Sequence, residues 1–535
     1  MRARSNSPLG VLACVLTVLC FAGCGAADRA PAGSLAELAP AGTDVYVEAV
    51  LEPDFDAREA INSVTERFPR GRRVEEAIAE AVDGRLRALA GPNTPLSFGR
   101  DVEPWLGDRF AFSADRLEAG MPQFSFALET LDPEAAAAAI ERLAASSSTP
   151  ATEREGELGP VFEIDSGVAG LGRLEVGMVG DRAVIASDAG RFDEVAALER
   201  ADEPQSLASR SDFSYAVGTA EGSSAIVFSW LDSADALDGA AERLGEPEVA
   251  ARFAGLARQA GVDSSEPASF ALGLTADVVL FDASLGLLEN ARPDPDAEAL
   301  LLGSLPLQSI FAAACSACLE AAVSGNAGDA VLDVLVDGRD REAVDRIRDR
   351  LNGLDRGLGP AAAFIYPQSP VTLAGGIVIE VRDPVAVGAA LNELRRRTAR
   401  LPGAAVSGVR LPRNTEAQGF EVRFRGESGT FIVAANDSRL VLARGRSAAV
   451  LALAPRVTLG DVRAFADFSD QLGDEFAPSA LLDVARIRGL LGPSPDPEVQ
   501  RLLRTIDEIN RAGAGVRVAD GRLITRLIVG LEGFD

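Results

Sequence analysis

Residues 124–133 read Phe-Ser-Phe-Ala-Leu-Glu-Thr-Leu-Asp-Pro, and residues 377–384 read Ile-Val-Ile-Glu-Val-Arg-Asp-Pro. Each stretch begins with an apolar run typical of a strand and ends in Asp-Pro. Asp-Pro is a sound helix start, because the Asp side chain caps free amides and Pro suits the first helical position. We therefore predict helices from these points to about Ala145 and Arg400. One strand-to-helix unit thus occurs twice in the chain.

Matched segments on both sides extend this parallel. They pair 40–47 with 306–313, 106–107 with 358–359, 162–164 with 420–422, 183–186 with 440–443, 224–227 with 479–482, and 272–277 with 516–520. Short turns with Gly or Asp, at 179–182 and 435–438, are typical of antiparallel hairpins. The sequence predicts an α+β fold of two tandem pseudo-repeats, each an antiparallel sheet with helices packed on one face. The alternative is that both halves share one continuous sheet.

The boundaries of the two repeats follow from these matches. We place the first α+β repeat at 34–290 and the second at 299–535, and the Pro- and Asp-containing segment 291–298 is predicted to be a linker. Its acids Asp294, Asp296 and Glu298 are more typical of a solvated segment than of a Ca²⁺ site.

The N-terminal residues have the order of an export signal. A positive start precedes an uncharged apolar stretch from residue 9 to residue 22, which is shorter than the about 20 apolar residues of a spanning helix. The stretch ends in Phe-Ala-Gly-Cys at 21–24, which resembles the lipobox of bacterial lipoproteins. An ordinary signal peptide that happens to contain Cys24 is the alternative.

The lipobox resemblance implies that Cys24 is lipidated and becomes the new N-terminus. We then expect a lipoprotein signal peptide at 1–23 and a flexible Ala-, Gly- and Pro-rich tether at 24–33. The expected location is extracytoplasmic, on the outer face of the cytoplasmic membrane, with the lipid anchor as the membrane contact.

Charge and composition narrow the function. The 535-residue chain has a net charge of −28, and such a surface repels phosphate backbones, so nucleic acid is not an expected partner. All 52 basic residues are Arg and His is absent, which excludes Ser-His-Asp triads, Ser-Lys dyads, Schiff bases and His-ligated metals. Carboxylate, Arg and thiol chemistry and Ca²⁺-type oxygen sites remain. We expect no cofactor, no metal and no catalytic residues.

Two segments carry a family resemblance. Residues 38–49, Leu-Ala-Pro-Ala-Gly-Thr-Asp-Val-Tyr-Val-Glu-Ala, and residues 101–109, Asp-Val-Glu-Pro-Trp-Leu-Gly-Asp-Arg, resemble the bacterial family called domain of unknown function 3352. The family is common in actinobacteria, and the resemblance covers nearly the whole mature length. It implies an extracytoplasmic location and supplies no activity or catalytic residues.

Two sets of residues are candidate sites. Trp105, Asp108 and Arg109 form a ligand-contacting loop or, as we favour, a structural turn with Trp105 in the core and Asp108 paired to Arg109 or capping a helix. Cys315 and Cys318 form the only C-x-x-C pair; a local disulfide is favoured over free thiols and over a redox-active pair.

The sequence favours a non-enzymatic, surface-anchored protein for binding or envelope organisation. Its ligand is expected to be apolar and to occupy a cleft between the repeats, because the chain is rich in Leu, Val and Phe. An envelope protein is the other expected partner, and the oligomeric state stays open. A carboxylate-based hydrolase and a purely structural interaction module are the alternatives.

Overall fold

A computed structural model describes most of the chain. The described residues are 33–51, 58, 61–62, 74–90, 94–115, 122–166, 172–201, 205–221, 225–233, 262–263, 265–275, 277–288, 293–316, 357–369, 372–425, 429–492, 496–507 and 509–531. The predicted signal peptide at 1–23, Cys24 and Cys318 lie outside them, as does the predicted tether except for Gly33.

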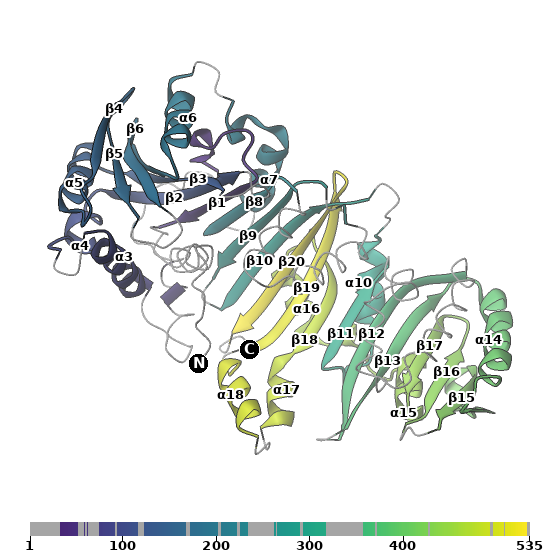
Figure 1. Cartoon of the computed structure of the whole chain (residues 1–535). Coiled ribbons are helices and arrows are strands. Elements are labelled where there is room, and N and C mark those ends of the chain that lie inside the picture. Colours follow the sequence, from purple (N-terminus) through teal and green to yellow (C-terminus); the bar gives the residue numbers. More distant parts are fainter. Residues whose placement is uncertain are drawn as a thin grey trace. The chain divides into compact units, whose positions relative to one another are not determined.

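The chain divides into two compact units (Figure 1). Unit 1 comprises residues 1–254 and 264–286, and unit 2 comprises residues 255–263 and 287–535. Both mix helices with a large antiparallel sheet. The boundary after residue 286 lies close to the predicted end of the first repeat at residue 290.

Among the described residues, the sheet of unit 1 has ten strands, each antiparallel to its neighbours. Their order is β4-β5-β6-β7-β3-β2-β1-β8-β9-β10. The bounds are β1 Val45–Val50, β2 Leu106–Asp115, β3 Gln123–Thr130, β4 Thr152–Gly156, β5 Gly159–Asp165, β6 Arg173–Val179, β7 Arg182–Ala186, β8 Val227–Leu231, β9 Ala268–Leu274 and β10 Val278–Gly286.

Helices cover both faces of this sheet. Their bounds are η1 Ala36–Leu38, α3 Val74–Ala90, α4 Phe98–Asp101, α5 Pro133–Ser146, α6 Ala189–Arg200, η2 Leu207–Ser209 and α7 Ser211–Glu221. On β7, Ala183 packs in the core under α5, whereas the next residue, Val184, packs in the core under α6. Successive strand residues point to opposite faces. We call these the α5 face and the α6 face.

The described part of unit 2 likewise has ten antiparallel strands in its sheet. Their order is β14-β15-β16-β17-β13-β12-β11-β18-β19-β20. The bounds are β11 Phe311–Cys315, β12 Leu358–Ser369, β13 Thr372–Val381, β14 Ala404–Gly408, β15 Gln418–Phe424, β16 Phe431–Ala435, β17 Arg439–Arg444, β18 Ala477–Asp483, β19 Ile509–Ala519 and β20 Arg522–Leu531.

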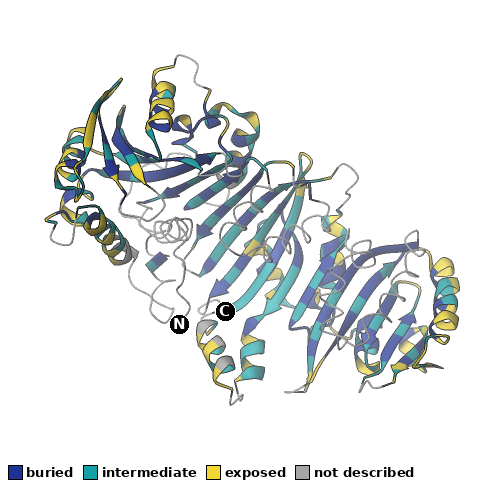
Figure 2. Ribbon diagram, in the orientation of Figure 1, coloured by how far each residue is buried: buried dark blue, intermediate teal, exposed yellow. Residues whose placement is uncertain are grey.

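Unit 2 likewise packs helices on two faces. The bounds are α10 Pro295–Gly303, α14 Pro384–Thr398, η4 Arg413–Thr415, α15 Arg446–Leu453, η5 Leu459–Asp461, α16 Arg463–Leu472, α17 Val484–Leu491 and α18 Pro497–Thr505. On β13, Val378 belongs to the core with α10 and α15, and the adjacent Ile379 belongs to the core with α14. Figure 2 shows the strands mostly buried or part-buried, with exposed residues on helices such as α5, α6 and α14.

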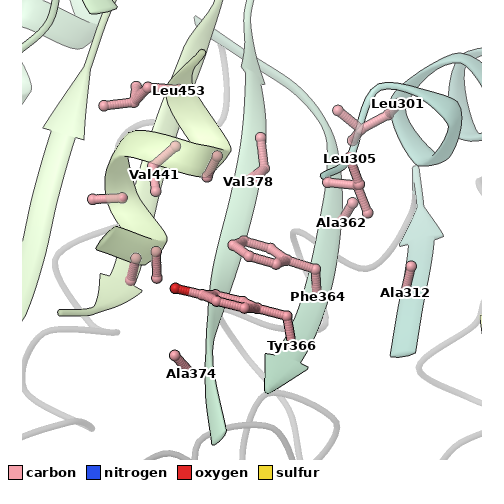
Figure 3. Close-up of a cluster of buried hydrophobic side chains, with 14 of the residues drawn as sticks. Leu301, Leu305, Ala312, Ala362, Phe364, Tyr366, Ala374, Val378, Val441 and Leu453 are labelled. Atoms are coloured by element: carbon pink, nitrogen blue, oxygen red, sulfur yellow. The ribbon is translucent and has the colours of Figure 1, made fainter. Parts of the chain in front are cut away.

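The largest core cluster lies in unit 2 (Figure 3). Leu301 and Leu305 come from α10 and the turn after it, and they pack toward Phe364 and Val378 of the sheet. The rings of Phe364 and Tyr366 stack with centroids 6.2 Å apart. Such stacking adds to the free energy gained by burying large rings.

The structure bears out some sequence predictions and corrects others. α5 begins at Pro133 and α14 at Pro384; Asp132 and Asp383 cap them by accepting bonds from backbone amides. The expectation of helices on one face is wrong in both units, because alternate strand residues are apolar on both sides. Residues 295–298 of the predicted linker form the first turn of α10 instead.

Candidate functional site

A large apolar cavity lies inside unit 1, between the α5 face of the sheet and α3, α4 and α5. Its volume is ≈ 290 Å³. All but two of the residues that line it are apolar, the exceptions being Arg85 and Asp101. The lining residues are Leu51, Val82, Arg85, Leu86, Leu89, Leu96, Phe98, Asp101, Val102, Trp105, Leu106, Phe110, Phe126, Leu128, Ala139, Ile140, Leu143, Val176, Ala183 and Ile185.

The sheet supplies one wall of the cavity through alternation along its strands. Phe110 on β2 and Leu128 on β3 face each other across the strand pair, and both line the cavity. Neighbouring residues such as Ala111 and Ala127 point to the α6 face and pack in other clusters. Three side chains of β6 and β7, including Ile185, extend the wall.

Helix α3 supplies the opposite wall. Val82, Arg85, Leu86 and Leu89 follow the spacing i, i+3, i+4 and i+7, so they share one helical face. The helix packs against α4 and α5. Because α3 and the sheet both line the cavity, its apolar face is turned to the void rather than fully packed.

Backbone hydrogen bonds hold this helical wall in place. The Phe98 amide at the start of α4 donates to the Asp83 carboxylate at 2.6 Å, which ties α4 to α3. The Ser148 amide after α5 donates to the Leu89 carbonyl at 3.0 Å. Trp105 donates from Nε1 to the Asp101 carbonyl at 2.6 Å, which fixes the indole in the cavity wall.

The Asp101 carboxylate is fully engaged in hydrogen bonds and ion pairs. It accepts hydrogen bonds from the Ser97 amide at 2.9 Å and from Arg100 Nη2 at 2.7 Å, and it lies 3.6 Å from Arg142 Nε. Burial acts to raise the pKa of Asp101, but these hydrogen bonds and the two guanidinium charges lower it below its usual value. Asp101 is therefore ionised and has little capacity left for a ligand.

A buried ion pair lies on the other face of the same strands. Arg109 Nη1 donates to Glu48 Oε1 at 2.7 Å, and both side chains are more than nine-tenths buried. Glu48 also accepts from Tyr46 Oη at 2.5 Å and from the Leu35 amide at 3.3 Å. Burial and the neighbouring Glu48 charge raise the pKa of Tyr46 well above its ordinary value, partly offset by Arg109.

The predicted cluster of Trp105, Asp108 and Arg109 does not form one site. Trp105 is 6% exposed and lines the cavity on the α5 face, whereas Arg109 reaches Glu48 on the α6 face. The separation arises because Trp105 precedes β2, in the turn after α4, whereas Arg109 lies within β2 and its neighbour Phe110 faces the cavity. The prediction that Trp105 belongs to the core holds; the partner of Arg109 is Glu48, which sequence reasoning missed.

Asp108 lies beside Glu129, and burial raises the pKa of both carboxyls. The Asp108 charge raises the pKa of Glu129 further, and the charges of Arg109 and Arg182 partly offset this. Two neighbouring carboxyls of this kind would suit hydrolysis only in a substrate pocket. Neither residue lines the apolar cavity.

The remaining candidate residues lie in unit 2. Cys315 is disulfide-bonded, and its predicted partner Cys318 lies outside the described residues, so that pairing stays a prediction. Asp294 caps α10 through the Ala297 amide, and Glu298 accepts two hydrogen bonds from Ser316. These two acids are thus engaged in holding the start of α10 to the end of β11.

Within the described residues, no group of three or more His, Cys, Asp and Glu side chains is arranged to hold a metal ion. No helix among them is long and apolar enough to cross a membrane.

Comparisons with known proteins are sparse. No family model matches the chain, and no curated protein matches its sequence. Among solved structures, crystal form III of TP0453 is 12% identical and has a TM-score of 0.27, with 52% of this chain and 89% of that chain covered. Crystal form I of TP0453 is 11% identical, with 51% and 85% covered and a TM-score of 0.26.

Proposed function

We propose that this protein binds a small apolar ligand in the cavity of unit 1 and catalyses no reaction. The observation that carries the proposal is the cavity itself, an apolar void walled by a sheet and three helices. The cavity is partly open to solvent, so its apolar lining meets water. Covering that lining with the apolar surface of a ligand is favourable. We place the ligand inside unit 1 instead of in the cleft between repeats that the sequence suggested.

The driving force for binding is burial of the ligand's apolar surface. Each methylene group moved from water into the cavity contributes about 0.8 kcal/mol. The volume of ≈ 290 Å³ is at the lower end of the roughly 300–1,000 Å³ typical of ligand pockets. It therefore suits one acyl chain or a small ring compound better than a double-chain lipid.

Trp105 offers a built-in reporter of occupancy. The chain has two Trp residues, and Trp230 is fully buried on the α6 face, away from the cavity. In a Trp230→Phe background, emission comes from Trp105 alone. Titration with a brominated fatty acid is expected to quench it with saturation.

A matched pair of variants on α5 tests the location. Ala139 lines the cavity, so Ala139→Phe is expected to fill part of it. The affinity for the brominated fatty acid, read from the midpoint of quenching, should fall at least tenfold. Ala145 is exposed on the same helix, and Ala145→Phe is expected to leave quenching unchanged. The proposal fails if the natural chain shows no saturable quenching, or if both variants bind as the natural chain does.

Native mass spectrometry with lipid extraction tests for a natural ligand. A reproducible apolar compound that co-purifies with the natural chain and is depleted in Ala139→Phe would support the proposal. An identical compound in both preparations would place it outside the cavity.

We further propose that the two units arose by duplication. The two strand orders correspond strand for strand, β4 to β10 against β14 to β20, with β3, β2 and β1 against β13, β12 and β11. The bulge after Leu106 has its counterpart after Leu358, each followed by Gly. An isolated bridge of Pro40 with Ser206 has its counterpart in Pro306 with Thr458.

The cellular location of the protein is also a proposal. The lipobox-like end of the leader supports lipidation of Cys24 and anchoring to the outer face of the cytoplasmic membrane. Incorporation of labelled palmitate that is lost in Cys24→Ser would support it, and equal incorporation in both would contradict it. Membership of the family called domain of unknown function 3352 stays a prediction.

A further inference from the structure

We infer that the cavity selects single-chain amphiphiles with an anionic headgroup, and that Arg85 binds that headgroup. This inference rests on the proposed function and names the ligand class of the same site. Its basis is one cation placed on the otherwise apolar inner face of α3.

Arg85 occupies a position where the helical pattern favours an apolar residue. It lies on the same face as Val82, Leu86 and Leu89, and it lines the cavity with them. The side chain is part-exposed, so Arg85 stands where the lining meets solvent. A ligand whose chain lies in the cavity can therefore present a polar group to this guanidinium without burying it completely.

Arg85 also has no partner of its own. Within the part of the chain that the structure describes, its guanidinium makes no hydrogen bond or ion pair. Asp101, the other charged residue of the lining, is already bound by the Ser97 amide and Arg100. The five N–H donors of Arg85 are thus the only unused polar groups on charged lining residues, and they match an anionic oxygen pair.

Local charge agrees with this assignment. The whole chain carries −28, yet the carboxylates of Asp101 and Asp83 at the helical wall are both engaged: Asp101 pairs with Arg100 and Arg142, and Asp83 accepts a hydrogen bond from the Phe98 amide. A cationic headgroup would meet repulsion here, and a neutral headgroup would leave Arg85 unpaired. The rival explanation is that the aliphatic stem of Arg85 only covers apolar surface while its head stays in water.

Three probes with the same alkyl chain separate these explanations. Dodecanoate, dodecanol and dodecyltrimethylammonium are titrated into the full chain below their micelle-forming concentrations, with calorimetry as the readout. Dodecanoate is expected to bind about tenfold or more tightly than dodecanol, because its carboxylate accepts charge-assisted hydrogen bonds from Arg85. The ammonium probe is expected to bind most weakly. Dodecyl phosphate is titrated in parallel, to tell a fatty-acid-like ligand from a phosphate-bearing one.

Arg85→Met and Arg87→Met supply the matched pair. Met keeps an apolar side chain of similar reach, so Arg85→Met is expected to weaken dodecanoate about tenfold and leave dodecanol unchanged. Arg87 is exposed on the same helix and absent from the lining, so Arg87→Met is expected to change neither. Equal affinity of dodecanoate and dodecanol for the natural chain would overturn the inference while leaving the proposed function intact. Failure of all probes to bind would overturn both.

Discussion

At the scale of single residues, Glu48 and Arg109 form a buried ion pair in unit 1. Both groups lie in the sheet core, where desolvation is costly and only a close partner compensates it. Glu48 is further bound by Tyr46 and the Leu35 amide. The network therefore joins the segment before β1 to two central strands of the sheet.

Removing one partner should be far more damaging than removing an exposed ion pair. Arg109→Leu leaves the Glu48 carboxylate buried without its counter-charge and is expected to lower the free energy of unfolding of unit 1 by about 3–5 kcal/mol. Arg173, which pairs with Glu163 at the surface, is the control, and Arg173→Ala should cost at most about 1 kcal/mol. Urea unfolding followed by Trp emission measures both, since Trp105 and Trp230 lie in unit 1. Equal losses would contradict the role of the pair.

Tyr46 gives a pH prediction. Its pKa is raised in the folded state, so the neutral phenol is favoured there. Stability from this shift is fully present below the unfolded value of about 10 and is lost as pH rises through the folded pKa. Spectrophotometric titration should show late-ionising Tyr residues, and Tyr46→Phe should remove one of them. A titration in which Tyr46→Phe removes an early-ionising residue would refute this.

At the scale of elements, Gly107 of β2 and Gly84 of α3 differ in how closely the surrounding atoms pack against them. A Cβ on Gly107 would lie 2.8 Å from the Glu129 backbone, so the bulge of β2 requires Gly there. A Cβ on Gly84, inside α3, would meet nothing within 4 Å. The sheet wall of the cavity is thus closely packed at this point, and the exposed side of α3 is free.

Alanine at these positions should have opposite effects. Gly107→Ala is expected to destabilise unit 1 by about 1–3 kcal/mol through overpacking. Gly84→Ala is expected to stabilise it by roughly 0.5–1 kcal/mol, because Gly in a helix interior loses more backbone entropy on folding. The midpoint of Trp emission in urea reports both shifts. Two shifts of the same sign would show that the helix or the bulge differs from the one described.

The sequence predicts helices well where a cap and a Pro coincide, as at Asp132 and Asp383. It predicts hairpins where a turn residue interrupts two apolar runs, and Val179 indeed pairs with Arg182. Continuous apolar runs are harder to align. The sequence match of 40–47 with 306–313 sets Tyr46 against Ala312, and in the sheet these residues pair with Trp230 of β8 and Leu481 of β18. By that register the match of 224–227 with 479–482 is displaced along the strand. Such runs carry no residue that fixes their register.

The cavity itself could not be predicted from the sequence. Its lining comes from segments scattered between Leu51 and Ile185, and an apolar side chain beside a void has the same identity as one in a packed core. A signal did exist at Arg85, which breaks the apolar face of α3. The sequence also singles out Trp105, but its place in the cavity wall depends on the turn before β2, which separates it from Arg109.

At the scale of the whole molecule, each unit has its own core, and we predict two separable unfolding transitions. Phe228→Ala in unit 1 and Phe364→Ala in unit 2 each remove a fully buried ring and should each cost about 3–5 kcal/mol. Only Phe228→Ala should shift the Trp emission midpoint. Phe364→Ala should shift a component of the circular dichroism signal alone. Displacement of both signals by either variant would mean that the units unfold together.

The strand order of unit 1 has a consequence for synthesis. β1 leaves the ribosome early, yet one of its two neighbours, β8, is made only after residue 226. Strands β9 and β10 follow later still, so the sheet cannot be completed before residue 286 has emerged. Contacts so distant in sequence form slowly, and the growing chain leaves an apolar strand edge unpaired meanwhile. Nascent unit 1 is therefore a stage at which this protein is exposed to aggregation and would benefit from a chaperone.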